Sequence, residues 1–305
     1  MKSTIYVPDI ECDSCVKVID RKLKELQGIE GIEFKPDAIE VAFNEALLKP
    51  ENIVTMIKNS GFRASTEPFD RKTITERFRD FRENRHKYAI EWQGVKYTFY
   101  TLFILIAFEL LLYSAFFRGI PNFWQTYGIW LFYLNLSIVT IGAALWHFKA
   151  YRAKVTCMVG MMIGMIIGMQ AGMMVGAIIG ATNGFFVGAM TGMLLGVGVG
   201  AIAGNCCGIM GILQGMMAGL MGGTMGPMIS LMMFSDNLHI FMPFYMAINI
   251  LILAGFSYMV IEEVVENRKV ERKPVDFQLF AAVSLIASAG LTLLMLYAPK
   301  SAFLG

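Results

Sequence analysis

Charged residues are scarce over most of this 305-residue chain. Asp, Glu, Lys and Arg make up 16% of it, against roughly 25% in an ordinary soluble domain. They are concentrated in residues 1–96 and 262–276, and the rest of the chain is nearly uncharged. This distribution is typical of a polar head joined to a membrane-embedded body. The net charge of +2 by itself indicates nothing about nucleic acid, because the charges are so unevenly placed. We expect no nucleic-acid partner.

Two further absences narrow the function. The first residues, MKSTIYVPDIECDSC, contain no apolar run, so we expect no secretory signal peptide and a head that stays in the cytosol. In that reducing compartment, the five cysteines favour metal binding over disulfides. The chain also lacks a phosphorylation-site motif and a nucleotide-binding loop, so we expect neither an ATP-driven pump nor an enzyme.

The head, residues 1–67, alternates between strand and helix patterns. Apolar residues at helical spacing predict two amphipathic helices, each closed by a glycine, at residues 13–28 and 49–61. Short alternating runs predict strands at residues 3–7, 31–36, 38–43 and 62–66. The order βαββαβ predicts an α+β, ferredoxin-like domain.

A C-x-x-C pair lies where the first strand meets the first helix. This places Cys12 in the loop and Cys15 in the first helical turn, where the helix N-terminus favours thiolates. Two neighbouring thiolates suit a soft ion such as Cu(I). The alternative is a thioredoxin-like redox pair, but no domain of thioredoxin length surrounds it.

Residues 1–67 resemble the heavy-metal-associated domain of copper chaperones and metal-pumping ATPases. The matching residues are Cys12-x-x-Cys15 and the segment IKNSGFRA, in which Gly61-Phe62 stands where the family carries Gly and an aromatic. The resemblance implies that Cys12 and Cys15 bind a metal ion and pass it on by thiol exchange. The family's usual methionine is missing before Cys12, and Glu11 precedes it directly. In relatives with an acidic residue there, it completes a site for Zn(II), Cd(II) or Pb(II). The alternative is a solvated carboxylate.

Residues 68–96 are predicted to form a basic juxtamembrane helix, either at the anionic inner leaflet or simply solvated. Residues 97–305 are predicted to form an all-α membrane domain with about seven spans, at residues 97–117, 124–147, 156–180, 185–203, 208–233, 240–261 and 277–297. Basic residues precede the first span and follow the second and sixth. The positive-inside rule therefore predicts a multi-pass protein of the cytoplasmic membrane, with its N-terminus in the cytosol and its C-terminus outside.

Thirteen glycines recur at every fourth position from Gly160 to Gly208. One helix over this tract would be about 72 Å long, more than twice a bilayer core, so it must fold back. The segments ATNGFF and AGNCCG are the expected turns. Repeated Gly-x-x-x-Gly predicts a glycine zipper of three closely packed helices and does not by itself predict transport.

Methionine and cysteine accompany these glycines. One stripe has a spacing of four and covers about 24 Å of helix: Cys157, Met161, Met165, Met169 and Met173. A second begins at Cys206 and Cys207 and continues through Met210, Met217, Met221, Met225, Met228 and Met232. Single methionines commonly fill cores. Two stripes that start at cysteines on the cytosolic side favour a path for a soft metal ion. His147, at the inner end of the second span, is a candidate fourth ligand or an interfacial residue.

Two other places hold candidate functional residues. The outer loop before the sixth span mixes soft and borderline ligands around His239: Met232, Met233, Asp236, Met242 and Met246. It is either a release site or an ordinary polar loop. Glu109 lies inside the first span, where a carboxylate is costly, so it is a candidate for proton coupling or for pairing with Asn135 or Asn249.

These patterns favour a heavy-metal transporter or channel that does not use ATP, with Cu(I) as its ion. Zn(II) and Cd(II) are the alternative ions. The head would exchange metal with the membrane thiols, and many weak thioether sites would let an ion pass without trapping it. A soluble metallochaperone and further copies of the chain are expected partners. The other hypotheses are a membrane-bound metal sensor or scaffold and a thiol–disulfide relay through Cys206 and Cys207.

Overall fold

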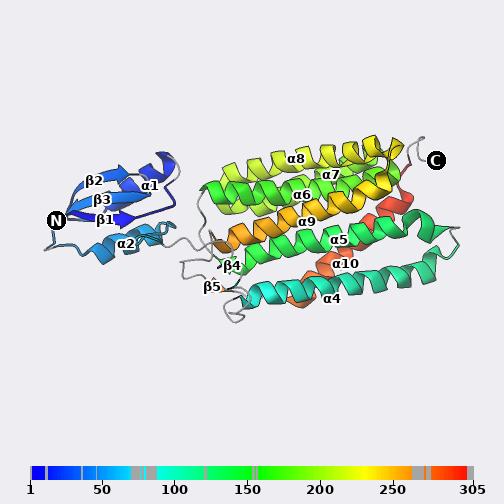
Figure 1. The fold of residues 1–305 in the computed structure, drawn as a ribbon, viewed down its shortest axis with the longest axis horizontal. Coiled ribbons are helices and arrows are strands. Elements are labelled where there is room, and N and C mark those ends of the chain that lie inside the picture. The colour runs from blue at the N-terminus through cyan, green and yellow to red at the C-terminus, as the bar shows by residue number, and fades with distance from the viewer. Residues whose placement is uncertain are drawn as a thin grey trace.

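The computed structural model describes residues 2–10, 13–35, 37–45, 47–69, 76, 79, 88–119, 122–152, 155, 157–262, 271–272 and 276–300. A small α+β head is followed by a bundle of long helices (Figure 1). Glu11, Cys12 and most of the predicted connector lie outside the described residues.

The head is an antiparallel sheet with two helices. Its strands are β1 (Lys2–Tyr6), β2 (Ile29–Lys35) and β3 (Ala38–Phe43), in the order β1-β3-β2, and its helices are α1 (Asp13–Lys24) and α2 (Pro50–Asn59). Alternate strand residues such as Ile5 and Ile39 share one core with Ile19 of α1 and Ile53 of α2. The small sheet and its helices agree with the predicted head.

The last predicted strand, residues 62–66, is reduced to a single bridge. Tyr6 and Ser65 exchange two backbone hydrogen bonds of 2.8 and 3.1 Å, which places this segment at the free edge of β1. Two residues earlier, the backbone N–H of Arg63 donates to the carboxylate of Asp9 at 2.7 Å. This part of the segment therefore bonds to a side chain of the loop after β1, and it does not extend the pairing with β1 beyond the single bridge.

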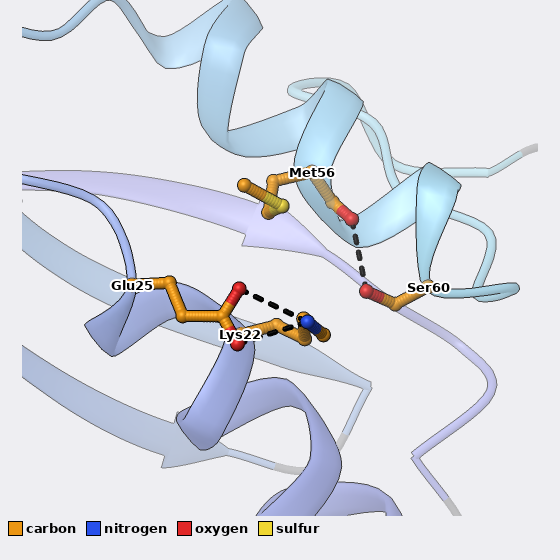
Figure 2. Close-up of polar contacts among 4 residues, drawn as sticks. All are labelled: Lys22, Glu25, Met56 and Ser60. Atoms are coloured by element: carbon orange, nitrogen blue, oxygen red, sulfur yellow. Dashed lines mark hydrogen bonds and ion pairs between the residues drawn. The ribbon is translucent and has the colours of Figure 1, made fainter.

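The polar contacts drawn in Figure 2 are local. Lys22 donates to both carboxylate oxygens of Glu25 at 2.9 Å, and the Ser60 hydroxyl donates to the Met56 carbonyl at 3.0 Å. Each contact joins residues three or four positions apart near a helix end. Exposed ion pairs of this kind stabilise a helix by about 0.3–0.5 kcal/mol. They support the helix ends and do not form a binding site.

Six apolar segments in the described residues are long enough to cross a membrane: Ala89–Ala115, Phe123–Ala150, Cys157–Asn183, Phe185–Ser235, Leu238–Val260 and Phe277–Tyr297. The helices within them are α4 (Ala89–Leu112), α5 (Phe123–Ala150), α6 (Cys157–Asn183), α7 (Phe185–Gly204), α8 (Gly208–Met232), α9 (Leu238–Val260) and α10 (Phe277–Tyr297). The 51-residue segment contains both α7 and α8, separated by a short 3-10 turn at Asn205–Cys207.

Helices α6, α7 and α8 meet through glycine backbones. A Cβ atom added at Gly164 would lie 2.9 Å from the Cα of Gly204, and one added at Gly168 would lie 2.9 Å from that of Gly200. The residue number of the contact rises along α6 as that of its partner falls along α7, so these two helices are antiparallel. At α7 and α8, a Cβ at Gly200 would overlap the carbonyl of Gly215. The chain reverses at Gly184 and next to Gly208, both with positive φ.

The loops gather at the two ends of the bundle. At one end, β4 (Tyr151–Arg152), which follows α5, pairs with β5 (Glu271–Arg272), which precedes α10. At the other end, the side-chain amide of Asn183 donates to the Ala298 carbonyl at 3.2 Å. We call the first of these the β4–β5 end. The start of α6 and the turn between α7 and α8 lie at the same end (Figure 1).

Candidate metal sites

In the head, the structure describes one of the two C-x-x-C cysteines. Cys15 is in the first turn of α1 and is 8% exposed, in the core that also contains Phe62. Gly61 before Phe62 has φ +95°, a conformation that L side chains rarely adopt. Cys12 and Glu11 lie outside the described residues, so their predicted roles stay predictions.

The segment after β1 is anchored by an ion pair that sequence reasoning missed. Asp9 is 3% exposed, and its carboxylate accepts from the side chain and the backbone of Arg63. The shortest contact, between Arg63 Nη2 and Asp9 Oδ1, is 2.6 Å. The pair joins the segment after β1 to the segment after Gly61-Phe62. The two residues are 54 positions apart, so no local pattern in the sequence indicates the pair.

Three cysteines lie at the β4–β5 end of the α6–α7–α8 unit. The sulfur atoms of Cys206 and Cys207 are 4.0 Å apart, and the Cys206 thiol lies 3.6 Å from the Ala203 carbonyl. Gly160 faces them, because a Cβ there would overlap the Cys207 sulfur and lie 3.0 Å from that of Cys206. Cys157 begins α6, less than one turn before Gly160. The absence of a side chain at Gly160 therefore makes room for the two sulfur atoms.

The structure does not gather a larger ligand set around these thiols. Over the described ranges, no three His, Cys, Asp or Glu side chains lie close enough to hold one metal ion. His147, a candidate fourth ligand, lies instead against α4. Its Nε2 atom is 3.6 Å from Glu91 Oε1, and its ring packs edge-on against Tyr151, whose hydroxyl donates to Glu91.

The two methionine stripes differ in exposure. Met161, Met165, Met169 and Met173 of α6 are half-buried. The methionines of α8 point away from the helix bundle, and Met217 is 63% exposed. Gln214, which lies between Met210 and Met217 in the chain, donates to the Met165 sulfur at 3.4 Å, so the α6 stripe lies beside α8 at this point. The α8 stripe is on the outside of the single chain.

The outer loop near His239 does not bring its candidate ligands together. His239 packs against Trp130 with ring centroids 6.0 Å apart. Met242 and Met246 are buried in the core of the bundle, where the Ser137 hydroxyl lies 3.9 Å from the Met246 sulfur. Asp236 is exposed and accepts from its neighbour Asn237. Glu109, the carboxylate within the first apolar segment, is 8% exposed in α4 and lies beside Asn135 of α5.

Comparison with known proteins gives one match. No curated protein and no solved structure matches the chain at a significant level. Residues 4–63 match the family model described as the heavy-metal-associated domain, which confirms the resemblance of the head. The matched segment contains Cys12, Cys15, Gly61 and Phe62 and stops short of the apolar helices. The head is therefore a heavy-metal-associated domain, a module that binds heavy-metal ions, and it precedes six apolar segments with the length of membrane spans.

Proposed function

We propose that the protein moves a heavy-metal ion, Cu(I), across a membrane without ATP, as a transporter or channel with a fused metal-binding head. One observation carries this proposal. A chain with a heavy-metal-associated domain also has two thiols 4.0 Å apart at one end of an apolar bundle. That separation is within the span of two metal–sulfur bonds of about 2.3 Å each. The head would exchange its ion with Cys157, Cys206 and Cys207.

The choice of Cu(I) rests on ligand type. Thiolates and thioethers are soft ligands, and they favour Cu(I) over ions that prefer oxygen. The candidate ligands of the apolar helices are sulfur atoms at almost every position, whereas Zn(II) would usually recruit histidine or carboxylate ligands as well. Zn(II) or Cd(II) remains the alternative, because Glu11 precedes Cys12 in the head.

The proposed orientation places the β4–β5 end in the cytosol. Seven crossings follow if α7 and α8 each cross the bilayer, and the glycine contacts of α6, α7 and α8 then form the zipper. An impermeant thiol reagent applied to intact cells should label a cysteine introduced at Ser235, between α8 and α9. It should not label one introduced at Ser65, in the head. Labelling at Ser65 would overturn the orientation and the cytosolic position of the three thiols.

The outward methionines of α8 suggest how the path is completed. Met210, Met217 and Met221 share one face at spacings of seven and four, the spacing of a helix–helix seam. In a single chain that face would meet lipid, where thioethers have no ligand role. We therefore propose that copies of the chain meet along α8 and enclose the path. Cysteine introduced at Met217 should form a dimer under mild oxidation, and cysteine at Leu251, on the exposed face of α9, should not.

Vesicles that contain the purified full-length protein test transport directly. Cu(I) and Zn(II) uptake should be compared for the wild type and for Cys206→Ser combined with Cys207→Ser. We expect Cu(I) flux above that of protein-free vesicles, and a loss of most of it in the double variant. The matched control is Ser235→Ala, an exposed hydroxyl at the other end. Flux of Zn(II) alone would overturn Cu(I) as the ion, and flux of neither ion would overturn transport.

A membrane-bound metal sensor or scaffold is the second candidate. It is favoured by the absence, among the described residues, of three gathered His, Cys, Asp or Glu ligands, and by glycine contacts that packing alone explains. Under this alternative, metal binding to the head would change the exposure of the apolar helices to protease without any ion crossing the membrane. Measured flux therefore separates the two candidates.

A further inference from the structure

One group of polar side chains is buried where α4 packs against α5 and α10; others, such as Gln170, Thr191 and Ser230, are buried in α6, α7 and α8. The buried residues of α4 are Glu91, Thr101, Leu105 and Glu109, so three of the four are polar. Facing helices contribute Asn135 of α5 and Ser284, Ser288 and Thr292 of α10, all buried. Polar side chains are expensive in a membrane and are retained there chiefly for function. This layer therefore has a role besides packing.

Several of these atoms have no hydrogen-bond partner in the protein. In the described part of the chain, they include Glu109 Oε1, Asn135 Nδ2, Thr101 Oγ1 and Thr292 Oγ1. Asn135 is held in place from the other side, since the Ser288 hydroxyl donates to its Oδ1 atom at 2.8 Å. Its amide nitrogen remains available beside the Glu109 carboxyl. Buried polar atoms without protein partners require water or an ion.

Among the described residues, no Lys, Arg or His forms an ion pair with Glu109, and Arg118, the nearest along the chain, is exposed and nine positions further on. Helix α10 contains no Asp, Glu, Lys, Arg or His, and its only titratable group is Tyr297, which is exposed at its end. In α5 the basic residues are His147, which lies against Glu91, and Lys149, which is exposed. The other titratable groups on these elements are Tyr127 and Tyr133 of α5, Tyr113 after α4, Tyr151 beside Glu91, and Lys96, Tyr97 and Tyr100 of α4 itself.

Distance separates Glu109 from every one of these basic groups. Glu91 and Glu109 are 18 residues apart on one face of α4, about 27 Å along the helix. Lys96 is about 20 Å from Glu109 along α4 and is exposed. A carboxylate buried in an apolar region without a cationic partner is strongly disfavoured unless it binds a proton or a cation. Glu109 is thus placed to take up a proton.

An apolar layer lies between the two glutamates. Leu105 of α4, Val139 of α5 and Phe280 of α10 form a small buried cluster, with exposures of 0%, 0% and 3%. The cluster separates the Glu91 end of the layer from Glu109, Asn135 and Ser288. A proton bound at Glu109 would therefore not pass freely to the Glu91 end. A coupled carrier requires such a barrier, because protons that leak across do not drive transport.

We propose that Glu109, with Asn135 and Ser288 as positioning residues, is a proton-binding site, and that protons are the ions whose movement drives metal transport. The carboxylate takes up one proton to become the neutral acid, and releases it when the helices rearrange. The Asn135 amide lies beside the carboxyl and is placed to donate to it, and the Ser288 hydroxyl holds that amide through its Oδ1 atom. Only the coupling to metal rests on the proposed function; proton binding at Glu109 does not.

Carbodiimide labelling tests the site without any transport. Dicyclohexylcarbodiimide reacts with protonated carboxyls in apolar surroundings, so it should modify Glu109 of the full-length protein in lipid at neutral pH. Modification should fall at least tenfold at alkaline pH, when the proton is lost, and peptide mass spectrometry would identify the residue. Protection by sodium ions at constant pH would show a metal-cation site instead and overturn the proposal. Absence of label at Glu109 at every pH would overturn it as well.

Proton movement in vesicles with a trapped pH indicator tests the coupling. An imposed Cu(I) gradient should change internal pH with wild-type protein, and Glu109→Gln should reduce this change at least tenfold. Gln keeps the shape of the side chain, and an unchanged elution volume in detergent shows that the variant is folded. The matched control is Asp276→Asn. Asp276 is exposed, and its carboxylate caps α10 by accepting from the backbone N–H of Gln278, a role that Asn can also fill.

The outcomes separate the two proposals. Metal flux that proceeds without a pH change, or is unaffected by Glu109→Gln, overturns proton coupling and leaves metal transport standing. Glu109-dependent labelling without any metal flux overturns metal transport and leaves the proton site standing. Wild-type proton movement in a folded Glu109→Gln variant overturns the site itself.

Discussion

The apolar bundle contains two kinds of helix packing. In the α6–α7–α8 unit, glycines bring helix backbones into contact, as at Gly200 and Gly215. Where α4 packs on α5 and α10, large side chains such as Leu105 and Phe280 separate the helices, and polar groups are buried between them. One half is close-packed through glycines and carries the methionine stripes, and the other buries the carboxyls of Glu91 and Glu109.

The physical basis of the difference is the glycine itself. Lipid offers no hydrophobic gain for helix association, so close backbone approach and van der Waals contact hold the α6–α7–α8 unit together. Helices in such contact leave little space between them, and ligands must lie at their ends or outer faces. This is where Cys206, Cys207 and the α8 methionines are. The α4 side has room for a buried carboxyl. If both proposals hold, soft-metal and proton chemistry occupy separate halves of the bundle.

The largest effect is expected where backbones touch. Gly200→Leu should abolish accumulation of folded protein, because its side chain would overlap the Gly215 carbonyl of α8. Gly198→Leu, two residues away in the same helix, should accumulate normally, because nothing lies within 4 Å of a Cβ there. Membrane levels and detergent elution profiles measure both. Equal levels of the two variants would show that close backbone contact does not hold the α6–α7–α8 unit together, and the proposed difference in packing from the α4 side would be lost.

A smaller effect, on flux rather than folding, is expected from the α6 methionines. Met165→Leu with Met169→Leu conserves volume, so folded protein should remain at wild-type levels. Two lost thioether contacts that together stabilise the passing ion by about 1.4 kcal/mol would slow Cu(I) flux about tenfold. Met174→Leu is the control, since Met174 is fully buried in the core. Wild-type flux in the double variant would assign these methionines to packing alone.

Gly160→Ala should act on the thiols alone. Its new methyl group would overlap the Cys207 sulfur and force the pair of thiols apart. We expect weaker Cu(I) binding by a protein that still assembles, because side chains at the exposed end of the unit can move aside. Competition with a Cu(I) chelator measures this, and Gly94→Ala, in open space on α4, is the control. Unchanged Cu(I) affinity would argue against the Cys206–Cys207 pair as a metal site.

The smallest effect is expected in the polar half. Ser288→Ala removes one hydrogen bond to Asn135 and should lower the free energy of unfolding by about 0.6 kcal/mol, the average for such bonds in membranes. Thermal unfolding in detergent measures it, with Ser235→Ala at an exposed position as the reference. A loss of several kcal/mol would mean that the polar network holds this half together, and the two halves would then differ less than proposed.

Much of the architecture could be predicted from the sequence, because it follows from local periodicity. The alternation of head strands, the two amphipathic helices and the C-x-x-C position depend on neighbours in the chain, and the family match to residues 4–63 confirms the resemblance of the head. The long apolar runs and the turns at Gly184 and Gly208 depend likewise on composition and on glycine's tolerance of positive φ.

Only the tertiary structure decided which distant residues meet. The Asp9–Arg63 pair, the position of His147 beside Glu91, and the Ser288–Asn135 hydrogen bond join residues 54, 56 and 153 positions apart. Hydrophobicity does not indicate the direction of the α8 methionines, because every face of this helix is apolar; only its glycines, at every fourth position from Gly211 to Gly223, mark a face for close packing. The glycines of α6 and α7 select it, by admitting only a glycine-bearing face of α8 and leaving the methionines outside.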